Sequence, residues 1–279
     1  MTQTPALSTA RRQIELSGRS LVMGILNVTP DSFFDGGRHF GPDEALRHAE
    51  RLIAEGADML DVGGESSRPG AAPLDEAEEQ ARVLPVIRAV VRRFDLPVSI
   101  DTWKPGTARA AVAEGAEIIN DIGGLRDPAM AAAAAETGAA VVAMHMRGVP
   151  AIMQQLPPSP DIMAEIHEFF EKLLQLPVQV NKIVLDPGIG FGKTATDNLI
   201  ILNRLKEFRV YRRPLLVGVS RKSFIGAVTG VPADARLPGS LAAGVVAALH
   251  GADILRCHDV AETLQALQVA QAIRQEAQG

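Results

Sequence analysis

Residues 183–193 read Ile-Val-Leu-Asp-Pro-Gly-Ile-Gly-Phe-Gly-Lys, a short apolar run that ends on the carboxylate of Asp186 and then turns through glycines. An apolar run that ends on a polar side chain occurs eight times along the chain. The other seven lead to Asn27, Asp61, Asp101, Asn120, His145, Ser220 and Arg256. Eight parallel strands whose carboxyl ends surround one point form a (β/α)8 barrel, and the active sites of such barrels lie on that face. The pattern therefore predicts a parallel barrel with a polar top.

Between the apolar runs, the apolar residues follow the spacing of amphipathic helices. The predicted helices cover 42–56, 74–94, 105–114, 128–137, 161–174, 197–208, 240–249 and 261–275, with a kink expected at Pro85. Several end at or beside a glycine, such as Gly138, which suits the left-handed residue that closes a helix. Strands that alternate with helices, without a change in composition, predict one domain over residues 1–279.

A doubly wound open sheet is the competing architecture. Such a sheet usually has fewer strands and gathers its ligand groups at one switch point. Here every strand end bears polar residues, so the pattern favours the closed TIM barrel. Residues 13–16, a turn at Ser17 and Gly18, and residues 20–24 suggest a short N-terminal hairpin that covers the barrel bottom. The proline-rich residues 149–160 are expected to form a loop.

Composition narrows the functional class. The chain has 279 residues, of which 47% are apolar and 22% charged, as in soluble globular proteins. A net charge of −5 without a basic stripe argues against a nucleic-acid partner. No apolar run approaches the roughly 18 residues of a membrane span, and the first twenty residues lack a signal-peptide core. The single cysteine, Cys257, fits a reducing compartment. The sequence therefore predicts a cytoplasmic protein that does not bind a membrane.

Three polar strand ends suit a flat heterocycle: Asp101, Asn120 and Asp186. A single aspartate at a strand end is more often a helix N-cap than a ligand group, but repetition around one rim shifts that balance. A carboxylate that accepts two parallel N–H bonds matches an amino-pyrimidinone. We therefore predict that these side chains bind the donor–acceptor edge of such a ring. His145 is open between a ligand role and a supporting role.

Cationic side chains gather on the same predicted face, although the chain is net acidic. They are Arg68, Lys222, Arg256 and His258. Ser223 would stand near the start of a short helix after the seventh strand, where barrels often bind phosphate or carboxylate. Local positive charge in an acidic protein indicates an anionic substrate.

The connections after the first two strands have the composition of lids. Residues 27–37 end in two glycines and carry the adjacent aromatics Phe33 and Phe34, for which a solvated loop has little use. Residues 61–70 contain paired glycines, which let backbone approach a ligand, and Arg68. The alternatives are an ordinary surface loop for the first and a turn with a surface arginine for the second.

Seven motifs, taken together and in order, resemble the dihydropteroate synthases. They are Met23-Gly-Ile-Leu-Asn-Val-Thr-Pro-Asp-Ser-Phe33, Gly64-Glu-Ser-Ser-Arg-Pro-Gly70, Ser99-Ile-Asp-Thr102, Asn120-Asp-Ile122, Leu185-Asp-Pro-Gly-Ile-Gly-Phe-Gly-Lys193, Val219-Ser-Arg-Lys-Ser-Phe224 and Arg256-Cys-His-Asp259. Each alone is weak, but the set is specific and spans almost the whole chain. The resemblance implies a barrel transferase that joins 6-hydroxymethyl-7,8-dihydropterin diphosphate to p-aminobenzoate, releasing pyrophosphate and dihydropteroate for folate biosynthesis. It also implies Mg²⁺, a homodimer and sulfonamide binding.

The resemblance further implies roles for residues of this chain. The pterin would be held by Asp101, Asn120, Asp186, Lys222, Met144, Gly218 and Phe191. The diphosphate would meet Asn27, Arg68, Arg256 and His258, with Asn27 also binding the metal. The p-aminobenzoate would meet Phe33, Ser67, Pro69, Lys222 and Ser223. The catalytic residues would be Asp101, Lys222, Arg256, His258 and Asp35, the last from the closed lid.

The chain departs from the family pattern at a few positions. Ser67 stands where threonine is commoner, Phe34 replaces a usual serine, and Cys257 replaces a usual valine, but no group with assigned chemistry is lost. The nearest rival is a methyltetrahydrofolate methyltransferase domain, which would not need the Ser-Arg-Pro-Gly and Ser-Arg-Lys-Ser-Phe sites for a second, carboxylated substrate. A paralogue that binds pterin without condensing it is the second rival.

Overall fold

The computed structural model describes residues 6–16, 18–28, 42–65, 74–150, 152–179 and 182–276. Within them, eight parallel strands form one sheet in the order β8-β7-β6-β5-β4-β3-β10-β9. The strands are β3 (Leu21–Asn27), β4 (Met59–Gly63), β5 (Val98–Asp101), β6 (Ile118–Asp121), β7 (Ala140–Met144), β8 (Ile183–Asp186), β9 (Leu216–Val217) and β10 (Ile254–Cys257). A parallel bridge from Leu185 to Leu215 joins the two end strands. The predicted (β/α)8 TIM barrel is therefore confirmed.

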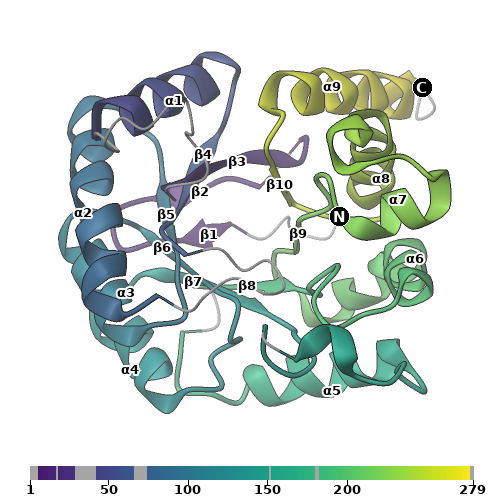
Figure 1. Cartoon of the computed structure of the whole chain (residues 1–279), viewed down its shortest axis with the longest axis horizontal. Coiled ribbons are helices and arrows are strands. Elements are labelled where there is room, and N and C mark those ends of the chain that lie inside the picture. Colours follow the sequence, from purple (N-terminus) through teal and green to yellow (C-terminus); the bar gives the residue numbers. More distant parts are fainter. Residues whose placement is uncertain are drawn as a thin grey trace.

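Helices surround the strands on the outside (Figure 1). They are α1 (Pro42–Ala54), α2 (Glu76–Arg93), α3 (Pro105–Ala113), α4 (Pro128–Thr137), α5 (Ile162–Leu173), α6 (Ala195–Arg204), α7 (Ser223–Thr229), α8 (Leu237–Leu249) and α9 (Val260–Glu276). Pro85 lies inside α2, which continues past it. Short 3-10 turns occur at η2 (Met153–Gln155), within the predicted loop, and at η4 (Leu205–Tyr211) and η5 (Ala233–Ala235).

The predicted helix over 197–208 has different bounds. It begins earlier, because Thr194 and Asp197 form a reciprocal capping box in which each side chain accepts the other residue's backbone N–H. It also ends earlier, because the chain tightens into the 3-10 turn η4 after Arg204. The helix after β8 is therefore shifted toward the loop that follows Asp186.

Alternation along the strands decides which side chains reach the inside of the barrel. In β5, Val98 and Ile100 belong to the core beneath the helices, so Ser99 and Asp101 point the opposite way. A separate inner cluster fills the lower barrel with Met23, Met59, Ile118, Val142, Val184, Leu216 and Ile254. Two residues further along six of these seven strands, on the same face, lie Asp61, Asn120, Met144, Asp186, Gly218 and Arg256. The period of two thus gives the barrel an apolar base and a polar mouth.

An N-terminal hairpin covers the apolar base. Strands β1 (Leu7–Ser8) and β2 (Gln13–Ile14) pair antiparallel, and Leu7, Ile14 and Leu16 pack within the inner cluster. A hairpin at the barrel bottom was predicted, but its assignment to residues 13–16 and 20–24 was wrong. Residues 21–27 form β3, which pairs with β4 and β10, because their apolar run is buried on both faces.

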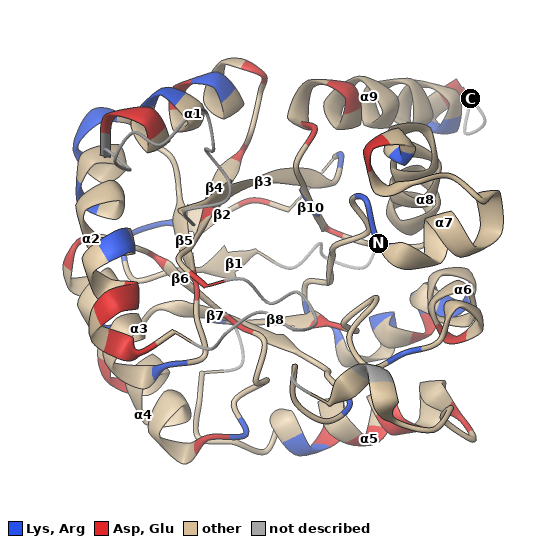
Figure 2. Cartoon of the chain, in the orientation of Figure 1, with Lys and Arg blue, Asp and Glu red and all other residues tan. Residues whose placement is uncertain are grey.

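Charged residues of both signs lie along the outer helices, for example on α1, α2 and α5 (Figure 2). None of the helices in the described ranges is long and apolar enough to cross a membrane.

Candidate active site

Arg256, on β10, lies between two carboxylates at the mouth of the barrel. Its Nε donates to Asp61 Oδ2 at 2.5 Å, and its Nη2 donates to Asp101 Oδ2 at 2.6 Å. Asp61 is fully buried, whereas the side chain of Asp101 is 18% exposed. The two acids hold one edge of the guanidinium, which leaves the rest of the planar fork to meet an anion.

Asn120, on β6, joins the same cluster. Its Nδ2 donates to Asp61 Oδ2 at 2.9 Å, and the residue is buried. The neighbouring Asp121 points the other way, and its carboxylate accepts the backbone N–H groups of Gly123 and Leu125, both at 2.7 Å. Asp121 therefore shapes the turn after β6, while Asn120 faces the mouth.

Asp186 ends β8 and holds the glycine-rich turn that follows. Its Oδ1 accepts the backbone N–H of Gly188 at 2.7 Å. Gly188 has a φ of 67°, and a Cβ added there would lie 1.9 Å from the carbonyl oxygen of His145. Only glycine fits this close approach. Lys193 closes the turn, since its Nζ donates to the carbonyl oxygens of His145 and Phe191 at 3.0 and 3.2 Å.

Lys222 connects the ends of β8 and β9. Its Nζ donates to the carbonyl oxygen of Ile189 and lies 4.5 Å from the centroid of the Phe191 ring. A Cβ on Gly218 would lie 3.9 Å from that same Nζ and 3.8 Å from Arg256 Cβ, so the missing side chain keeps space between the two cations.

His258 and Ser223 flank this face. The hydroxyl of Ser220 lies 2.9 Å from His258 Nδ1 and accepts the backbone N–H of His258 at 3.3 Å, which ties the end of β10 to the loop after β9. Ser223 is the first residue of α7, as predicted. Arg221, between them, is used by an ion pair with Asp259.

Burial shifts the pKa values of the charged groups at the mouth. It raises the pKa of Asp101 to about 7, against the pull of Arg256, and it raises the pKa of Asp186, against Lys222 and the Gly188 N–H. Burial lowers the pKa of Lys222 to about 8 and that of Lys193 to about 7. For Arg256, burial would lower the pKa, but Asp61 and Asp101 raise it above its ordinary value. Several titratable groups with shifted pKa values in one place are typical of functional sites.

An apolar wall stands beside these polar groups. Buried Ile122, Met144, Met146 and Met153 form a cluster of their own, against which Trp103 and Phe191 pack. Met144 and Phe191 were predicted site residues, whereas Ile122, Met146 and Trp103, which belong to the same cluster, were not among the predictions. A methionine or isoleucine after a strand has the same sequence pattern whether it lines a site or fills the core.

Asp61 and Lys193 are polar residues that sequence reasoning also left without a role. The available signal for Asp61 was a carboxylate directly after the apolar residues Met59 and Leu60 and shortly before two glycines, a position that lies in the middle of β4. For Lys193 the signal was a lysine at the end of a glycine turn, because such a lysine can bond the carbonyls that the turn exposes.

Asn27, the last residue of β3, approaches Asp101. A Cβ added to Gly63 would lie 3.8 Å from Asn27 Oδ1 and 3.6 Å from Asp101 Oδ2, so both oxygens lie near one point. Among the described residues, no group of three His, Cys, Asp or Glu side chains could hold a metal ion. Mg²⁺ usually takes one or two protein oxygens together with water and substrate phosphates. The residues present fit an ion that arrives largely with its substrate.

Five predicted site residues lie outside the described residues. They are Phe33, Asp35, Ser67, Arg68 and Pro69. Glu65, which precedes the second of these segments, is held by an ion pair with Lys104 and accepts Trp103 Nε1–H at 3.1 Å. The start of the loop that follows β4 is therefore fixed to the loop after β5.

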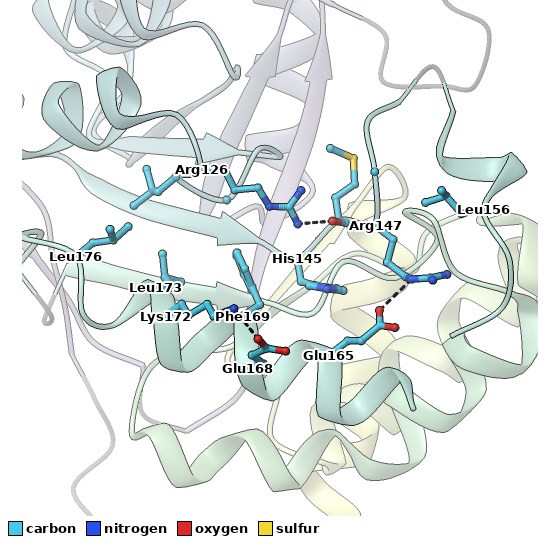
Figure 3. A pocket seen from close by; sticks show the side chains of 14 residues that line it. Arg126, His145, Arg147, Leu156, Glu165, Glu168, Phe169, Lys172, Leu173 and Leu176 are labelled. Atoms are coloured by element: carbon cyan, nitrogen blue, oxygen red, sulfur yellow. Dashed lines mark hydrogen bonds and ion pairs between the residues drawn. The ribbon is translucent and has the colours of Figure 1, made fainter. Parts of the chain in front are cut away.

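His145 stands apart from the mouth and lines a side cavity of about 670 Å³, together with Arg126 and Phe169 (Figure 3). Its ring centroid is 5.4 Å from that of Phe169, and burial lowers its pKa to about 2, so the imidazole is neutral. Its backbone N–H donates to the carbonyl oxygen of Asp186 at 2.8 Å. His145 thus supports the site through its main chain.

Comparisons with known proteins agree with this geometry. A family described as "Pterin binding enzyme" matches residues 23–258. Dihydropteroate synthase of Escherichia coli K12 is 49% identical over 255 residues, which cover 90% of each chain. The structure of the Yersinia pestis dihydropteroate synthase with a sulfonamide drug has a TM-score of 0.90 and 46% identity, covering 97% of this chain and 99% of that one. The Xanthomonas albilineans enzyme with 4-aminobenzoic acid has a TM-score of 0.91 and 44% identity, covering 97% and 98%. The same enzyme with 7,8-dihydropteroate has a TM-score of 0.88 and 42% identity, covering 97% and 99%.

Proposed function

We infer the reaction from family membership: this chain belongs to the pterin-binding enzymes and, among them, to the dihydropteroate synthases. It is a transferase that condenses 6-hydroxymethyl-7,8-dihydropterin diphosphate with p-aminobenzoate, giving 7,8-dihydropteroate and pyrophosphate in folate biosynthesis. The observation that carries the assignment to this site is the joint presence of carboxylates, an amide and cations in one apolar-walled mouth.

The pterin ring is held by Asp101, Asn120 and Asp186 as hydrogen-bonding groups. In support of this, Asp101 and Asp186 end their strands and Asn120 is the last residue but one of β6, and each has a buried or half-buried polar side chain. Lys222 adds a donor, and the ring lies against the apolar wall. The wall residues and the open space of this proposal are Met144, Phe191 and Gly218.

The diphosphate binds Arg256, His258 and Arg68, with Asn27 and Mg²⁺. The free edge of the Arg256 guanidinium and the tethering of His258 by Ser220 support this. Asn27, with Asp101 nearby, would hold the metal ion, which when bound supplies charge neutralisation to the leaving pyrophosphate.

The chemical step needs no strong base, since the aniline nitrogen of p-aminobenzoate is already a nucleophile. The difficulty is expulsion of pyrophosphate, so the main task is to stabilise charge that develops as the C–O bond breaks. Arg256 and His258 stabilise negative charge on the leaving group. Asp101 and Asp186 stabilise a cationic pterin, and because Asp186 is buried and Asp101 mostly buried, little water competes for their carboxylates.

The p-aminobenzoate is framed by Lys222 and Ser223, together with Phe33, Ser67 and Pro69. Asp35 belongs to the lid that closes over the reacting groups, which gives ordered binding with the pterin first. Support for this part comes from the position of Ser223 at the start of α7, next to Lys222.

We further propose that the chain works as a cytoplasmic homodimer and that residues 1–279 form one domain. Large exposed apolar side chains lie on α7, α8 and α9, which are neighbours in the fold (Figure 1). They are Val228, Val246, Leu249, Val269 and Ile273. Exposed apolar side chains on adjacent helices favour this side of the barrel as the dimer interface.

A pair of variants tests the division of the site. Asp186→Ala should abolish binding of 6-hydroxymethylpterin, because it removes the ring's carboxylate and releases Gly188. Ser67→Ala should leave pterin binding intact and weaken p-aminobenzoate, measured by titration calorimetry in the presence of pyrophosphate. Equal loss of both ligands in both variants would contradict the division.

A further inference from the structure

Asp61 is the acid in the mouth that has no role in the proposed reaction. It is 0% exposed, and its Oδ2 accepts two hydrogen bonds, from Asn120 Nδ2 at 2.9 Å and from Arg256 Nε at 2.5 Å. Its Oδ1 is buried and has no hydrogen-bond partner. A carboxylate that is covered in this way cannot touch a ligand, yet it contacts one proposed pterin residue and one proposed diphosphate residue.

We propose that Asp61 is a positioning residue that presets Asn120 and Arg256, and so aligns the pterin and diphosphate regions before either ligand arrives. This inference rests on the proposed function. In the proposed site, Asp61 would act only through Asn120 and Arg256.

Asp61 fixes which end of the Asn120 amide faces the ligand. The two ends of an amide have nearly the same shape, so sterics alone do not decide which end faces the ligand. A carboxylate oxygen only accepts, so Nδ2 must face Asp61, and a flipped amide would bring two acceptors together. Asn120 therefore presents its carbonyl oxygen and its second N–H in a fixed order. A heterocycle with the reverse donor–acceptor order would leave buried polar groups unpaired.

Asp61 also fixes the orientation of the Arg256 guanidinium. Its plane is held at two points, Nε on Asp61 and Nη2 on Asp101. Asp101 is partly exposed and is itself a proposed pterin ligand, so its position depends on what occupies the mouth. Asp61 is fully buried and lies on the central part of β4, which pairs with β3 and β5. It is the anchor that stays in place when the ligand changes.

A simple counter-ion role makes a different prediction. Removing a negative charge beside Arg256 would by itself strengthen the binding of an anion. Lost alignment would weaken it. The sign of the change in pyrophosphate affinity therefore separates the two roles.

The experiment compares Asp61→Val, which removes both the charge and the acceptor, with Asp61→Asn, which keeps an acceptor oxygen in place of Oδ2. Titration calorimetry measures the affinity for 6-hydroxymethylpterin and, separately, for pyrophosphate with Mg²⁺. We expect Asp61→Val to weaken both by about 10-fold or more, the effect of one lost oriented hydrogen bond. We expect Asp61→Asn to keep the pterin affinity within about threefold and not to weaken pyrophosphate.

Glu117→Gln is the matched control. Glu117 is also a buried acid, but its partners are Thr9 and Arg12 at the barrel bottom. This variant should lower thermal stability without changing either affinity. If Asp61→Val gave unchanged pterin affinity or tighter pyrophosphate binding, the positioning role would be wrong. If the wild type bound neither probe, the proposed function would fail and this inference with it.

A second measurement needs no Asp61 variant and decides the matter if Asp61→Val does not fold. In ¹⁵N-asparagine-labelled wild type, the Asn120 side-chain amide, assigned by its loss in Asn120→Asp, should exchange slowly with solvent before any ligand is added. Fast exchange that slows only after 6-hydroxymethylpterin binds would overturn the claim that the amide is preset.

Discussion

Replacing Arg256 with methionine probes the charge cluster on which the proposed site depends. Arg256→Met keeps the apolar stem and removes the guanidinium, which leaves Asp61 and Asp101 as neighbouring carboxylates without their shared partner. Removing one member of a buried ion pair costs about 3–5 kcal/mol. Because the Arg256 side chain is 23% exposed, we take the lower end, about 3 kcal/mol. The free energy of unfolding of a whole domain is typically about 5–15 kcal/mol, so the variant should still fold.

The assay is urea unfolding at pH 8, where Asp101 is largely ionised, and again at pH 6. Arg256 lowers the pKa of Asp101, so in the variant that pKa should rise further above its value of about 7. A carboxylate whose folded pKa is raised stabilises the fold at low pH and loses this contribution as the pH rises through that pKa. The loss caused by Arg256→Met should therefore shrink at pH 6.

Adding Asp61→Asn and Asp101→Asn should recover more than half of the lost stability, because neutral amides need no counter-ion. The reasoning is refuted if Arg256→Met costs less than about 1 kcal/mol, or if it costs the same in the wild type and in the Asp61→Asn/Asp101→Asn background. Either result would mean that the guanidinium is not coupled to these two acids.

Three further predictions concern other parts of the fold. His145→Phe should make the stability of the fold less sensitive to acid. The pKa of His145 is about 2 in the folded protein and 6.5 when unfolded, so the free energy of unfolding of the wild type falls by up to about 1.4 kcal/mol per pH unit below pH 6.5. Urea titrations of the variant at pH 7 and 5.5 should lack this slope. Gly188→Ala should lower the affinity for 6-hydroxymethylpterin by about 10-fold or more, because its Cβ would sit 1.9 Å from the His145 carbonyl oxygen, and an unchanged affinity in calorimetry would count against the turn geometry. Leu7→Ala should cost about 2–5 kcal/mol of unfolding free energy if the hairpin completes the inner cluster, and a loss near zero would show that it does not.

The barrel was predictable because its rules act locally along each strand. Val98 and Ile100 face the helices, while Ser99 and Asp101 face inward, and this alternation is legible in the order of the residues. The strand ends on the inner face were therefore recognised as one polar rim before any contact was known.

What the sequence could not reveal depends on partners that are distant along the chain. The N-terminal hairpin has two strands of only two residues each, and its turn is tied down by Thr9 and Arg12 to Glu117. No local pattern in residues 6–16 announces that distant acid. The second strand of the hairpin was therefore wrongly assigned to the more regular apolar run that forms β3.

The same limit explains why Asp61 was noticed in the sequence but its role became visible only in the structure. Its partners Asn120 and Arg256 stand on β6 and β10, far away in sequence, and each was predicted to bind a ligand itself. A residue that acts on ligand groups from behind has no motif of its own. Its role becomes visible only when three strands bring the side chains within hydrogen-bonding distance.

Pyrophosphate release by the purified protein tests most directly whether the polar mouth of this barrel is a dihydropteroate synthase site. We expect release only when 6-hydroxymethyl-7,8-dihydropterin diphosphate, p-aminobenzoate and Mg²⁺ are all present. One dihydropteroate should form per pyrophosphate, and Asp186→Ala should abolish the reaction. Binding of the pterin without any pyrophosphate release would contradict this expectation and would identify a pterin-binding protein that does not condense its ligand.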